Sequence, residues 1–278
     1  MISRMQTQAA GGELGRLLRH WRDLRGKSQN ELSLDTEISQ RHLSFIESGR
    51  SVPSRPTLVN IAQALEIPLR ERNQLFLAAG FAPAYVDDAW DASGMAAVRR
   101  ALTRVLHQHE PFPAVVMDRY WNVLMTNEAA PRFFNAFVDL AARPTPRNML
   151  HLMFDPAGMR PHIANWNSAS KGLLERVRRE AVGHVMDERT RQLMDELLSY
   201  PGTGDAHADA VPLTDESVLP VIPLSFIKHG QTLNYFSMVS TVGTPLTIAA
   251  QELRVECMFP MDVPTETLHM ALMAATNA

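Results

Sequence analysis

The sequence has a single cysteine, Cys257, in 278 residues. One cysteine excludes an intrachain disulfide and any metal cluster built on several thiolates. On a predicted buried strand we expect it to be a core thiol rather than a redox sensor. No apolar run approaches the roughly 20 residues that a membrane-spanning helix needs, and the first residues lack the apolar core of a signal peptide. We expect a cytoplasmic protein that does not enter a membrane.

Patterns typical of catalytic sites are also missing. The sequence contains no GxSxG, no HExxH, no phosphate-binding glycine loop and no cysteine–histidine pattern. His107 and His109 alternate like a chelating pair, but no third ligand lies nearby in the sequence. His184 and Glu188 have the i, i+4 spacing of an ordinary surface pair on a helix. We therefore predict no enzyme activity, no metal site and no cofactor.

Net charge is small, at −3, but it is divided unevenly along the chain. Residues 1–80 hold eleven Lys and Arg against eight Asp and Glu, whereas residues 81–278 hold sixteen against twenty-two. A basic part joined to an acidic part is typical of a polyanion-binding domain followed by a domain with another purpose. The length and a hydrophobic share of 45% fit two globular domains.

The first eighty residues predict five short helices, over 14–24, 29–36, 40–49, 58–65 and 70–80. Ser28 and Glu31 have the spacing of a capping box, which predicts the start of the second helix. Ser39 is a suitable N-cap for the third helix. The second and third helices are separated by a tight turn, which is the helix-turn-helix arrangement.

The stretches "SQNELS", "SQRHLSFIESGR" and "PSRPTL" carry a resemblance, over residues 13–80, to the Xre-type, phage-repressor family of DNA-binding domains. The resemblance implies that the third helix enters the major groove of double-stranded DNA. It places Gln40 and Arg41 on base edges, because Gln can pair with adenine and Arg with guanine. The implied DNA-binding residues are Gln29, Ser39, Gln40, Arg41, His42, Ser44, Phe45 and Arg50.

Several of these positions have distinct implied roles. Phe45 can touch a thymine methyl group, and Gln29 and Arg50 match family positions that hold phosphates, contacts that set register without reading sequence. For His42, a phosphate or solvent role remains as open as a base contact. Arg22 and Glu47 match the positions of an ion pair that ties the first helix to the third.

One position departs from the family pattern. The family often has glycine in the turn between the second and third helices, where this chain has Glu37. Because a non-glycine residue with positive φ is uncommon, the geometry of this turn is in doubt, although the flanking residues fit.

The domain organisation follows from composition. We expect a flexible N-terminus over 1–12, the helix-turn-helix domain over 13–80, a linker over 81–95 and a second domain over 96–278. The stretch "PAVVMDRYWNVLMTNEAAPRFF" predicts strands over 114–117 and 121–125, then a helix capped by Asn127, which is how PAS-like sensory domains begin. A helical middle, a polar loop "GTGDAHADA", a hairpin with "HG" at its tip and a last strand near "QELRVECMFPMD" predict an antiparallel sheet with helices on one side.

The stretches "HEPFPAVVMDRYWNVLMTNEAAPRFF", "NMLHLMFDPAGMRPHIANW" and "FSMVSTVGTPLTIAAQELRVECMFPMD" resemble the MmyB-like ligand-binding domain of bacterial transcription regulators. This resemblance implies a PAS-like fold that holds an apolar, fatty-acid-like effector between helices and sheet. Aromatic side chains and flexible methionines suit such a pocket, although each can equally belong to an ordinary core. The candidate pocket residues are Phe112, Trp121, Met149, Met153, Phe154, Trp166, Phe236, Met238 and Met258.

Together these observations predict an α+β protein: an all-α, five-helix helix-turn-helix domain followed by a PAS-like α+β domain with an antiparallel sheet. We expect a bacterial transcription regulator that binds a double-stranded DNA operator as a homodimer and senses a small apolar ligand. Two alternatives remain open. The second domain can be a dimerisation or protein-docking module without ligand, or it can be an enzyme attached to the DNA-binding domain.

Overall fold

A computed structural model describes residues 2–182, 187–203, 221 and 223–275. The chain forms two compact units, and each is described by itself. The N-terminal unit contains Met1–Asp88 together with Pro245–Gln251, and the C-terminal unit contains Ala89–Thr244 and Glu252–Ala278. The short segment Pro245–Gln251, which holds most of helix α11 (Ile248–Glu252), therefore belongs to the N-terminal unit although it lies far along the chain.

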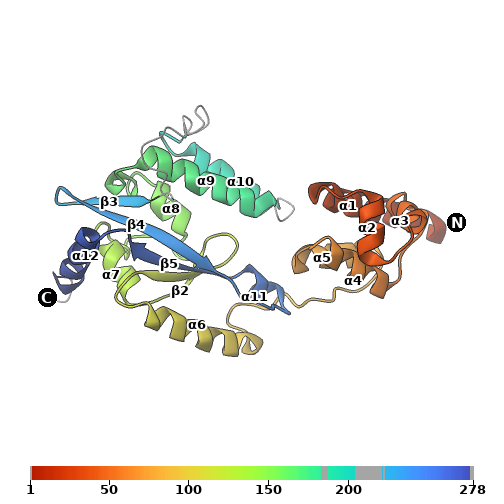
Figure 1. The fold of residues 1–278 in the computed structure, drawn as a ribbon, viewed down its shortest axis with the longest axis horizontal. Coiled ribbons are helices and arrows are strands. Elements are labelled where there is room, and N and C mark those ends of the chain that lie inside the picture. The colour runs from red at the N-terminus through yellow and green to blue at the C-terminus, as the bar shows by residue number, and fades with distance from the viewer. Residues whose placement is uncertain (1, 183–186, 204–220, 222, 276–278) are drawn as a thin grey trace. The chain divides into compact units, whose positions relative to one another are not determined.

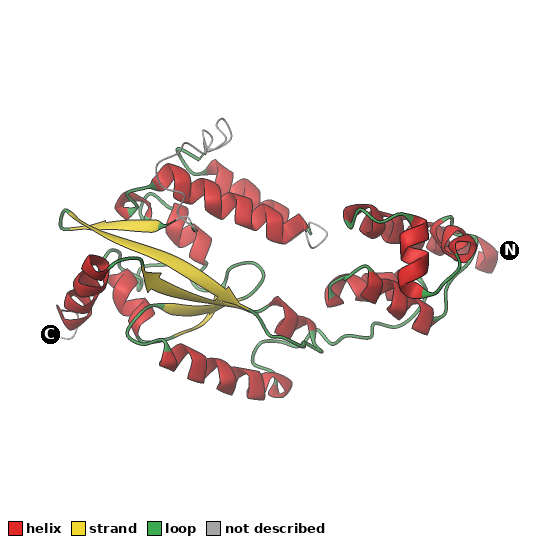
Figure 2. Ribbon diagram, viewed as in Figure 1, coloured by secondary structure: helices red, strands yellow, loops and turns green. Residues whose placement is uncertain are grey.

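The N-terminal unit is built around five helices, drawn in Figure 1 and coloured by type in Figure 2: α1 (Ile2–Leu24), α2 (Gln29–Thr36), α3 (Gln40–Glu47), α4 (Arg55–Ala64) and α5 (Leu69–Ala78). The predicted caps are present, because Ser28 Oγ accepts from Glu31 N while the Glu31 carboxylate accepts from Ser28 N. Apolar side chains from all five helices meet in one core, among them Leu14, Trp21, Leu32, Leu43, Leu58 and Phe76. Helix α1 begins at Ile2, within the residues 1–12 for which the sequence predicts a flexible N-terminus, and that flexibility stays a prediction.

The turn between α2 and α3 keeps its geometry at a local cost. Glu37 adopts φ 56° and ψ 20°, the left-handed conformation that glycine takes without penalty. For a residue with a Cβ atom this conformation costs roughly 1–2 kcal/mol. The departure noted in the sequence therefore leaves the helix-turn-helix intact and weakens it slightly.

The C-terminal unit is a five-stranded antiparallel sheet with helices packed against it (Figure 1). Its strands are β1 (Ala114–Met117), β2 (Val123–Thr126), β3 (Leu224–Lys228), β4 (Gln231–Ser240) and β5 (Arg254–Pro260), in the spatial order β2-β1-β5-β4-β3. Its helices are η1 (Ser93–Met95), α6 (Ala96–Gln108), α7 (Ala129–Asn135), α8 (Met149–Phe154), η2 (Arg160–His162), α9 (Trp166–Val182), α10 (Glu188–Ser199) and α12 (Val263–Ala275). The fold is α+β, as predicted.

Helices lie on both faces of this sheet, so the predicted one-sided arrangement is wrong. Helices α8, α9 and α10 lie on one side in Figure 1 and α6 lies on the other. All four residues of β1 are buried, and both α6 and α7 pack against this strand. The sequence does not reveal this feature. A short run of apolar residues such as "AVVM" has no alternation of apolar and polar positions, so it does not show whether one or both faces of the strand are covered.

The first hairpin of this unit differs from the prediction at Trp121. The second strand begins at Val123, and Trp121 lies in the turn with φ 66°. Asp118 Oδ1 organises the turn by accepting from the amides of Tyr120 and Asn122. Asn127 caps α7 as expected, because its Oδ1 accepts from Ala130 N at 3.1 Å.

Other predicted features have simple outcomes. The "HG" hairpin tip is present, with positive φ at His229 and Gly230, a pairing typical of a tight two-residue turn. The predicted polar loop lies almost entirely outside the described residues, as does His184.

His109 Nε2 lies 2.8 Å from Met258 O, and within the described ranges no three His, Cys, Asp or Glu side chains gather as a metal site requires. None of the helices in the part of the chain that the structure describes is long and apolar enough to cross a membrane.

Candidate functional site

Helix α3 presents the predicted base-reading side chains at its start. Ser39 caps this helix, because its Oγ accepts from His42 N at 3.3 Å. The cap fixes where the helix begins, and the exposed side chains of Gln40 and Arg41 therefore leave from its first turn. His42, Ser44 and Phe45 follow along the same short helix and are half-buried. The geometry suits insertion of the helix N-terminus into a major groove.

A buried carboxylate holds α3 against α1 and α2. Glu47 has a side chain only 3% exposed, and Arg22 donates to both of its oxygens, at 2.7 and 3.2 Å. Gln29 Nε2 also donates to it, at 2.9 Å. Burial alone would raise the pKa of Glu47, but the hydrogen bonds from Arg22 and Gln29 outweigh it, so that pKa lies below its ordinary value. The ion pair implied by the resemblance is therefore present and is supported by a third side chain.

Gln29 has a different place from the one that its implied role suggests. Its amide nitrogen, the group that would donate to a phosphate, already donates to Glu47. A phosphate contact by this amide would need that bond to be released. The phosphate role of Gln29 remains a prediction.

Phe45 lies between the two predicted DNA-contacting arginines. The Arg41 and Arg50 guanidinium carbons lie 5.5 and 5.8 Å from the centroid of its ring. Cation–π attraction of this kind restrains an otherwise free side chain. Arg50 follows α3, where its exposed side chain can reach a phosphate. The ring therefore supports the two arginines, in addition to the thymine contact that the resemblance implies.

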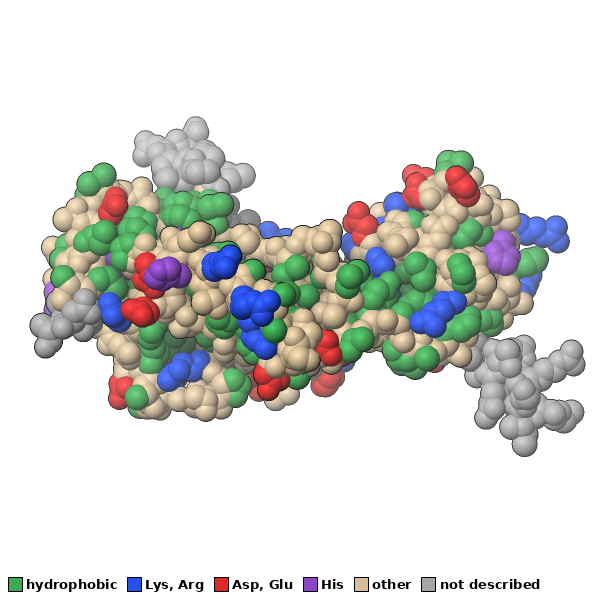
Figure 3. Space-filling model, turned by 90° about the horizontal axis from the view of Figure 1, so that it is seen from below, with side chains coloured by type: hydrophobic (Ala, Val, Ile, Leu, Met, Phe, Trp, Pro, Cys, Tyr) green, Lys and Arg blue, Asp and Glu red, His purple; other side chains and the backbone are tan. Residues whose placement is uncertain are grey.

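Charge is not gathered into a field of one sign on the face drawn in Figure 3. Acidic and basic side chains are interspersed there with hydrophobic ones on each unit. The excess of basic residues in the N-terminal part of the sequence therefore does not form a patch on this face.

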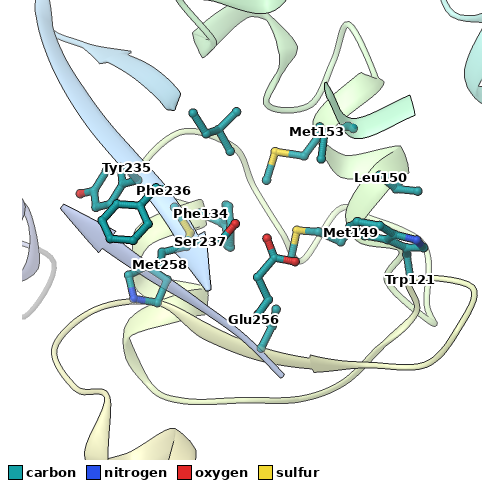
Figure 4. A pocket seen from close by; sticks show the side chains of 14 residues that line it. Trp121, Phe134, Met149, Leu150, Met153, Tyr235, Phe236, Ser237, Glu256 and Met258 are labelled. Atoms are coloured by element: carbon teal, nitrogen blue, oxygen red, sulfur yellow. The ribbon is translucent and has the colours of Figure 1, made fainter. Parts of the chain in front are cut away.

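The C-terminal unit contains an apolar hollow between its sheet and the helices α7, α8 and α9 (Figure 4). The volume that a water-sized molecule can occupy in it is only about 40 Å³, within about 550 Å³ of space between protein atoms that includes open solvent. Its apolar walls are typical of small-molecule pockets. Those walls are Pro113, Val115, Trp121, Phe134, Met149, Leu150, Met153, Leu173, Leu224, Tyr235, Phe236, Ser237, Glu256 and Met258. In the sheet, Val115 pairs with Glu256 and Ser237 pairs with Met258, and paired residues share a face.

The predicted pocket residues divide into two groups. Five line the hollow: Trp121, Met149, Met153, Phe236 and Met258. Phe112 lies outside the hollow and contacts the His269 ring at a centroid distance of 4.7 Å. Phe154 is fully buried and packs edge-on against Trp166 at 5.1 Å, so both belong to the core. Met238 does not line the hollow and is 57% exposed, because its side chain leaves from the face of β4 opposite to Ser237. Phe236 precedes Ser237 and leaves from the same face as Met238, where its ring stacks on Phe259 at 5.5 Å.

Glu256 is the charged residue among the described walls of the hollow, and the sequence analysis did not predict it. Its carboxylate points into the space between Met149 and Ser237 in Figure 4. Its side chain is 15% exposed, and Arg176 Nη1 donates to its Oε2 at 3.1 Å. Arg176 also donates to Glu180 and lies over the Trp121 ring at 4.4 Å. The strict alternation of β5 was the available signal, since Glu256 and Met258 must share a face.

Tyr235 has a fixed role in the wall of the hollow. Its hydroxyl lies 2.9 Å from His269 Nδ1, and His269 Nε2 lies 2.9 Å from Pro111 O. Because a carbonyl oxygen only accepts, Nε2 carries the proton and Nδ1 accepts from the hydroxyl. Burial holds the pKa of Tyr235 well above its usual value and lowers the pKa of His269. Both groups are therefore neutral and ordered, and their hydrogen-bonding atoms are occupied.

Comparisons with known families agree with the two units. Residues 98–272 match the family described as MmyB-like transcription regulator ligand binding domain, and residues 13–75 match a helix-turn-helix domain. A comparison with curated proteins gave no match. The first match spans more than half of the chain and contains the apolar hollow, while the second contains α3 and its supporting ion pair. The chain belongs to the family of transcription regulators that join a helix-turn-helix domain to an MmyB-like ligand-binding domain.

Proposed function

We propose that this regulator binds a two-fold symmetric operator as a homodimer and that an apolar, fatty-acid-like effector in the hollow changes its affinity for that operator. The observation that carries the DNA part is the capped start of α3, where Gln40 and Arg41 are exposed on a helix held by the Glu47 network. One such helix reads only a few base pairs. Two copies on half-sites about 34–36 Å apart would supply the missing affinity and specificity.

The proposed roles of the two arginines can be separated by experiment. A preferred operator is first selected from random DNA duplexes with the full-length protein. Arg41→Ala should lower affinity for this operator about tenfold or more and relax base choice, because a bidentate guanine contact gives roughly 1–3 kcal/mol of discrimination. Arg50→Ala should weaken operator and random DNA alike and reduce the dependence on salt. Equal effects of both variants on both DNAs would contradict these roles.

The effector part of the proposal rests on the hollow and on one connection in the chain. The hollow is lined by β4 and β5, and the chain that joins these two strands contains Pro245–Gln251, which belongs to the N-terminal unit. There Gln251 Oε1 accepts from Leu69 N at 2.7 Å, and Ile248 N donates to Val86 O at 3.0 Å. A ligand that moves β4 or β5 would pull directly on a segment packed in the DNA-binding unit.

Leu69 depends on this distant segment for local reasons. It is the first residue of α5, and Pro68 at the cap position has no side chain that can accept its amide. Gln251 therefore acts as the N-cap of α5 from far along the chain. An effector can regulate only if it binds the DNA-competent and incompetent forms with different affinity, and this contact supplies a physical difference between them.

Native mass spectrometry of the freshly purified full-length protein tests the effector and the dimer together. We expect a dimer that carries a lipid-sized adduct, which organic extraction removes and which changes operator affinity when restored. A dimer with no adduct, and with no response to added apolar compounds, would favour the alternative in which the C-terminal unit only dimerises or docks a partner.

A further inference from the structure

We infer that the C-terminal unit has a second ligand site, a polar groove beside helix α8, and that this groove takes a small organic dianion such as a phosphate monoester. The polar groove consists of two adjoining hollows, which share Pro146, Asn148 and His151 as wall residues. The inference goes beyond the proposed function, because none of these three residues lines the apolar hollow or belongs to the DNA-binding unit.

The polar groove offers more room than the apolar hollow does. Water-sized molecules can occupy about 240 Å³ on one side of His151 and about 300 Å³ on the other, compared with about 40 Å³ in the apolar hollow. A small organic molecule therefore has space in the groove without any movement of its walls.

The same two segments wall the groove and the apolar hollow from opposite sides. Tyr120 and Asn122 line the groove, whereas Trp121 between them lines the apolar hollow. In helix α8, His151 lines the groove while Met149 lines the apolar hollow. Further walls come from α10, which packs against α8 on the same side of the sheet (Figure 1). A ligand in the groove would therefore lie against α8 and α10, where its binding can be measured.

Positive charge predominates in the groove. Its walls carry Arg143, Arg147 and Arg189 against two carboxylates, those of Asp155 and Glu196. Asp155 pairs with Arg143, and Glu196 is engaged at 3.2 Å by the imidazole that separates the two hollows. Within the described ranges no carboxylate pairs with Arg147 or Arg189. The groove therefore holds two guanidinium charges that an anionic ligand can neutralise.

Local contacts hold both of these guanidinium groups in place. Arg147 Nε and Nη2 donate to one backbone carbonyl oxygen at 3.3 and 3.1 Å, a neutral partner that leaves the positive charge uncompensated. The Arg189 guanidinium carbon lies 4.1 Å from the centroid of the Tyr120 ring, whose hydroxyl donates to Asp187 Oδ2 at 2.7 Å. Asp187 itself pairs with Arg119 at 3.3 Å. Because both exposed arginines are restrained, less entropy is lost when they bind an anion.

The chemistry of the walls decides the class of ligand. Arginine offers planar N–H donors that match the oxygens of phosphate and carboxylate groups, and two such side chains favour a ligand with two negative charges. Leu140, Pro144 and Leu152 supply an apolar wall in the larger of the two hollows, which suits a small organic body attached to the anionic group. A cationic ligand would be repelled by the two unpaired arginines.

The first test compares three probes with the same benzene ring: phenyl phosphate, benzyl alcohol and benzylamine. Titration calorimetry of the full-length protein at pH 7.5 and physiological salt should give phenyl phosphate an affinity about tenfold or more above the other two, because charge-assisted hydrogen bonds are the stronger ones. Hydrogen exchange then locates the bound probe. Phenyl phosphate should slow exchange in peptides from residues 140–155 and from α10, and it should leave α3 unchanged.

Arg147→Gln and Arg189→Gln provide the second test, with Arg191→Gln as the matched control. Each of the first two changes removes an unpaired positive charge from the groove and should weaken binding of phenyl phosphate about tenfold. Arg191 also lies on α10, but it pairs with Glu188 at 2.8 Å and does not line the groove, so its change should leave the affinity unaltered. All three arginines are exposed, so none of these changes removes a core contact.

The competing explanation is attraction of the anion to the DNA-binding unit. If Arg50→Ala abolishes binding of phenyl phosphate while the two groove variants keep it, the anion binds there and the inference is wrong. Equal affinities for phenyl phosphate and benzyl alcohol would show that charge plays no part, which overturns the class of ligand. Absence of binding, or protection only outside α8 and α10, overturns the site itself. None of these outcomes bears on the proposed operator or apolar effector, whose tests use other ligands.

Discussion

The two sites of this protein are built in opposite ways. The proposed DNA-binding surface lies on the eight-residue helix α3 and at Arg50 just after it, and the residues that hold α3 in place, Arg22 and Gln29, lie close by in the sequence. The hollow draws its walls from β1, β3, β4, β5 and the helices α7, α8 and α9, whose residues range from Pro113 to Met258. One site is therefore defined by caps and helix spacing, and the other by how distant strands pair.

This difference shows in the errors of the sequence-based predictions. The limits of α2 and α3 were placed almost to the residue, because serine caps and glycine stops act locally. In the C-terminal unit five of the nine candidate pocket residues line the hollow and four lie elsewhere, and ligand binding by the hollow stays a prediction. Being aromatic or a methionine does not tell a core residue from a pocket residue, since both are apolar and buried.

The largest expected effect tests the reassignment of Phe154 from pocket to core. Phe154→Ala should lower the free energy of unfolding of the C-terminal unit by about 4 kcal/mol, because a fully buried ring packed on Trp166 is lost. Urea unfolding of the full-length chain, followed by hydrogen exchange of peptides from this unit, measures the loss. A cost below about 1 kcal/mol would return Phe154 to the wall of a ligand site.

The next effect concerns the N-terminal unit and its Glu47 network. Arg22→Met should destabilise this unit by about 3 kcal/mol at pH 7, because a carboxylate 3% exposed loses its bidentate partner. The measurement is hydrogen exchange in α1 and α3. Loss of operator binding without loss of protection would instead assign Arg22 to the DNA contact.

Lowering the pH should narrow the difference in unfolding free energy between the wild type and Arg22→Met. In the wild type the pKa of Glu47 is lowered, so its stabilisation is present above the unfolded pKa of about 4.3 and is lost as pH falls through the lower folded value. In Arg22→Met, burial should raise the pKa of Glu47, and the variant then gains stability as pH falls toward 4. Unfolding titrations between pH 7 and 4 should show the two proteins converging. A constant gap would contradict the proposed ionisation of Glu47.

A smaller effect on stability is expected when the hydrogen bond between Gln251 and Leu69 is removed. Gln251→Ala removes the acceptor of Leu69 N and should cost about 1 kcal/mol in the stability of α5. Its effect on regulation should be larger in proportion, because operator affinity should respond less to ligand in the hollow. Gln251→Glu keeps an acceptor oxygen and serves as the matched control. An unchanged response in Gln251→Ala would show that the signal takes another route.

The smallest expected effect is a gain in the stability of the N-terminal unit. Glu37→Gly should stabilise the N-terminal unit by about 0.5–1 kcal/mol, because glycine adopts φ 56° without a Cβ penalty. Thermal unfolding of the full-length protein measures the shift, and Glu37→Ala, which keeps the Cβ, should give no such gain. Destabilisation by glycine would mean that the Glu37 side chain contributes contacts that outweigh its backbone strain.

The sequence by itself determined the N-terminal site. Ser28, Ser39 and the apolar spacing fix α2 and α3 through hydrogen bonds and helix periodicity that act over a few residues. The exposed positions of Gln40 and Arg41 follow directly from the cap at Ser39. Even the strain at Glu37 was visible as an unusual residue at a position that favours glycine.

The tertiary structure alone decided the rest. Only the pairing of β1, β4 and β5 brings Glu256 beside Ser237 in an apolar hollow, and only the packing of Pro245–Gln251 makes Gln251 the cap of α5. These arrangements join segments that are distant in the sequence. They depend on strand register and chain path, which apolar patterning and local propensity do not encode in any one segment.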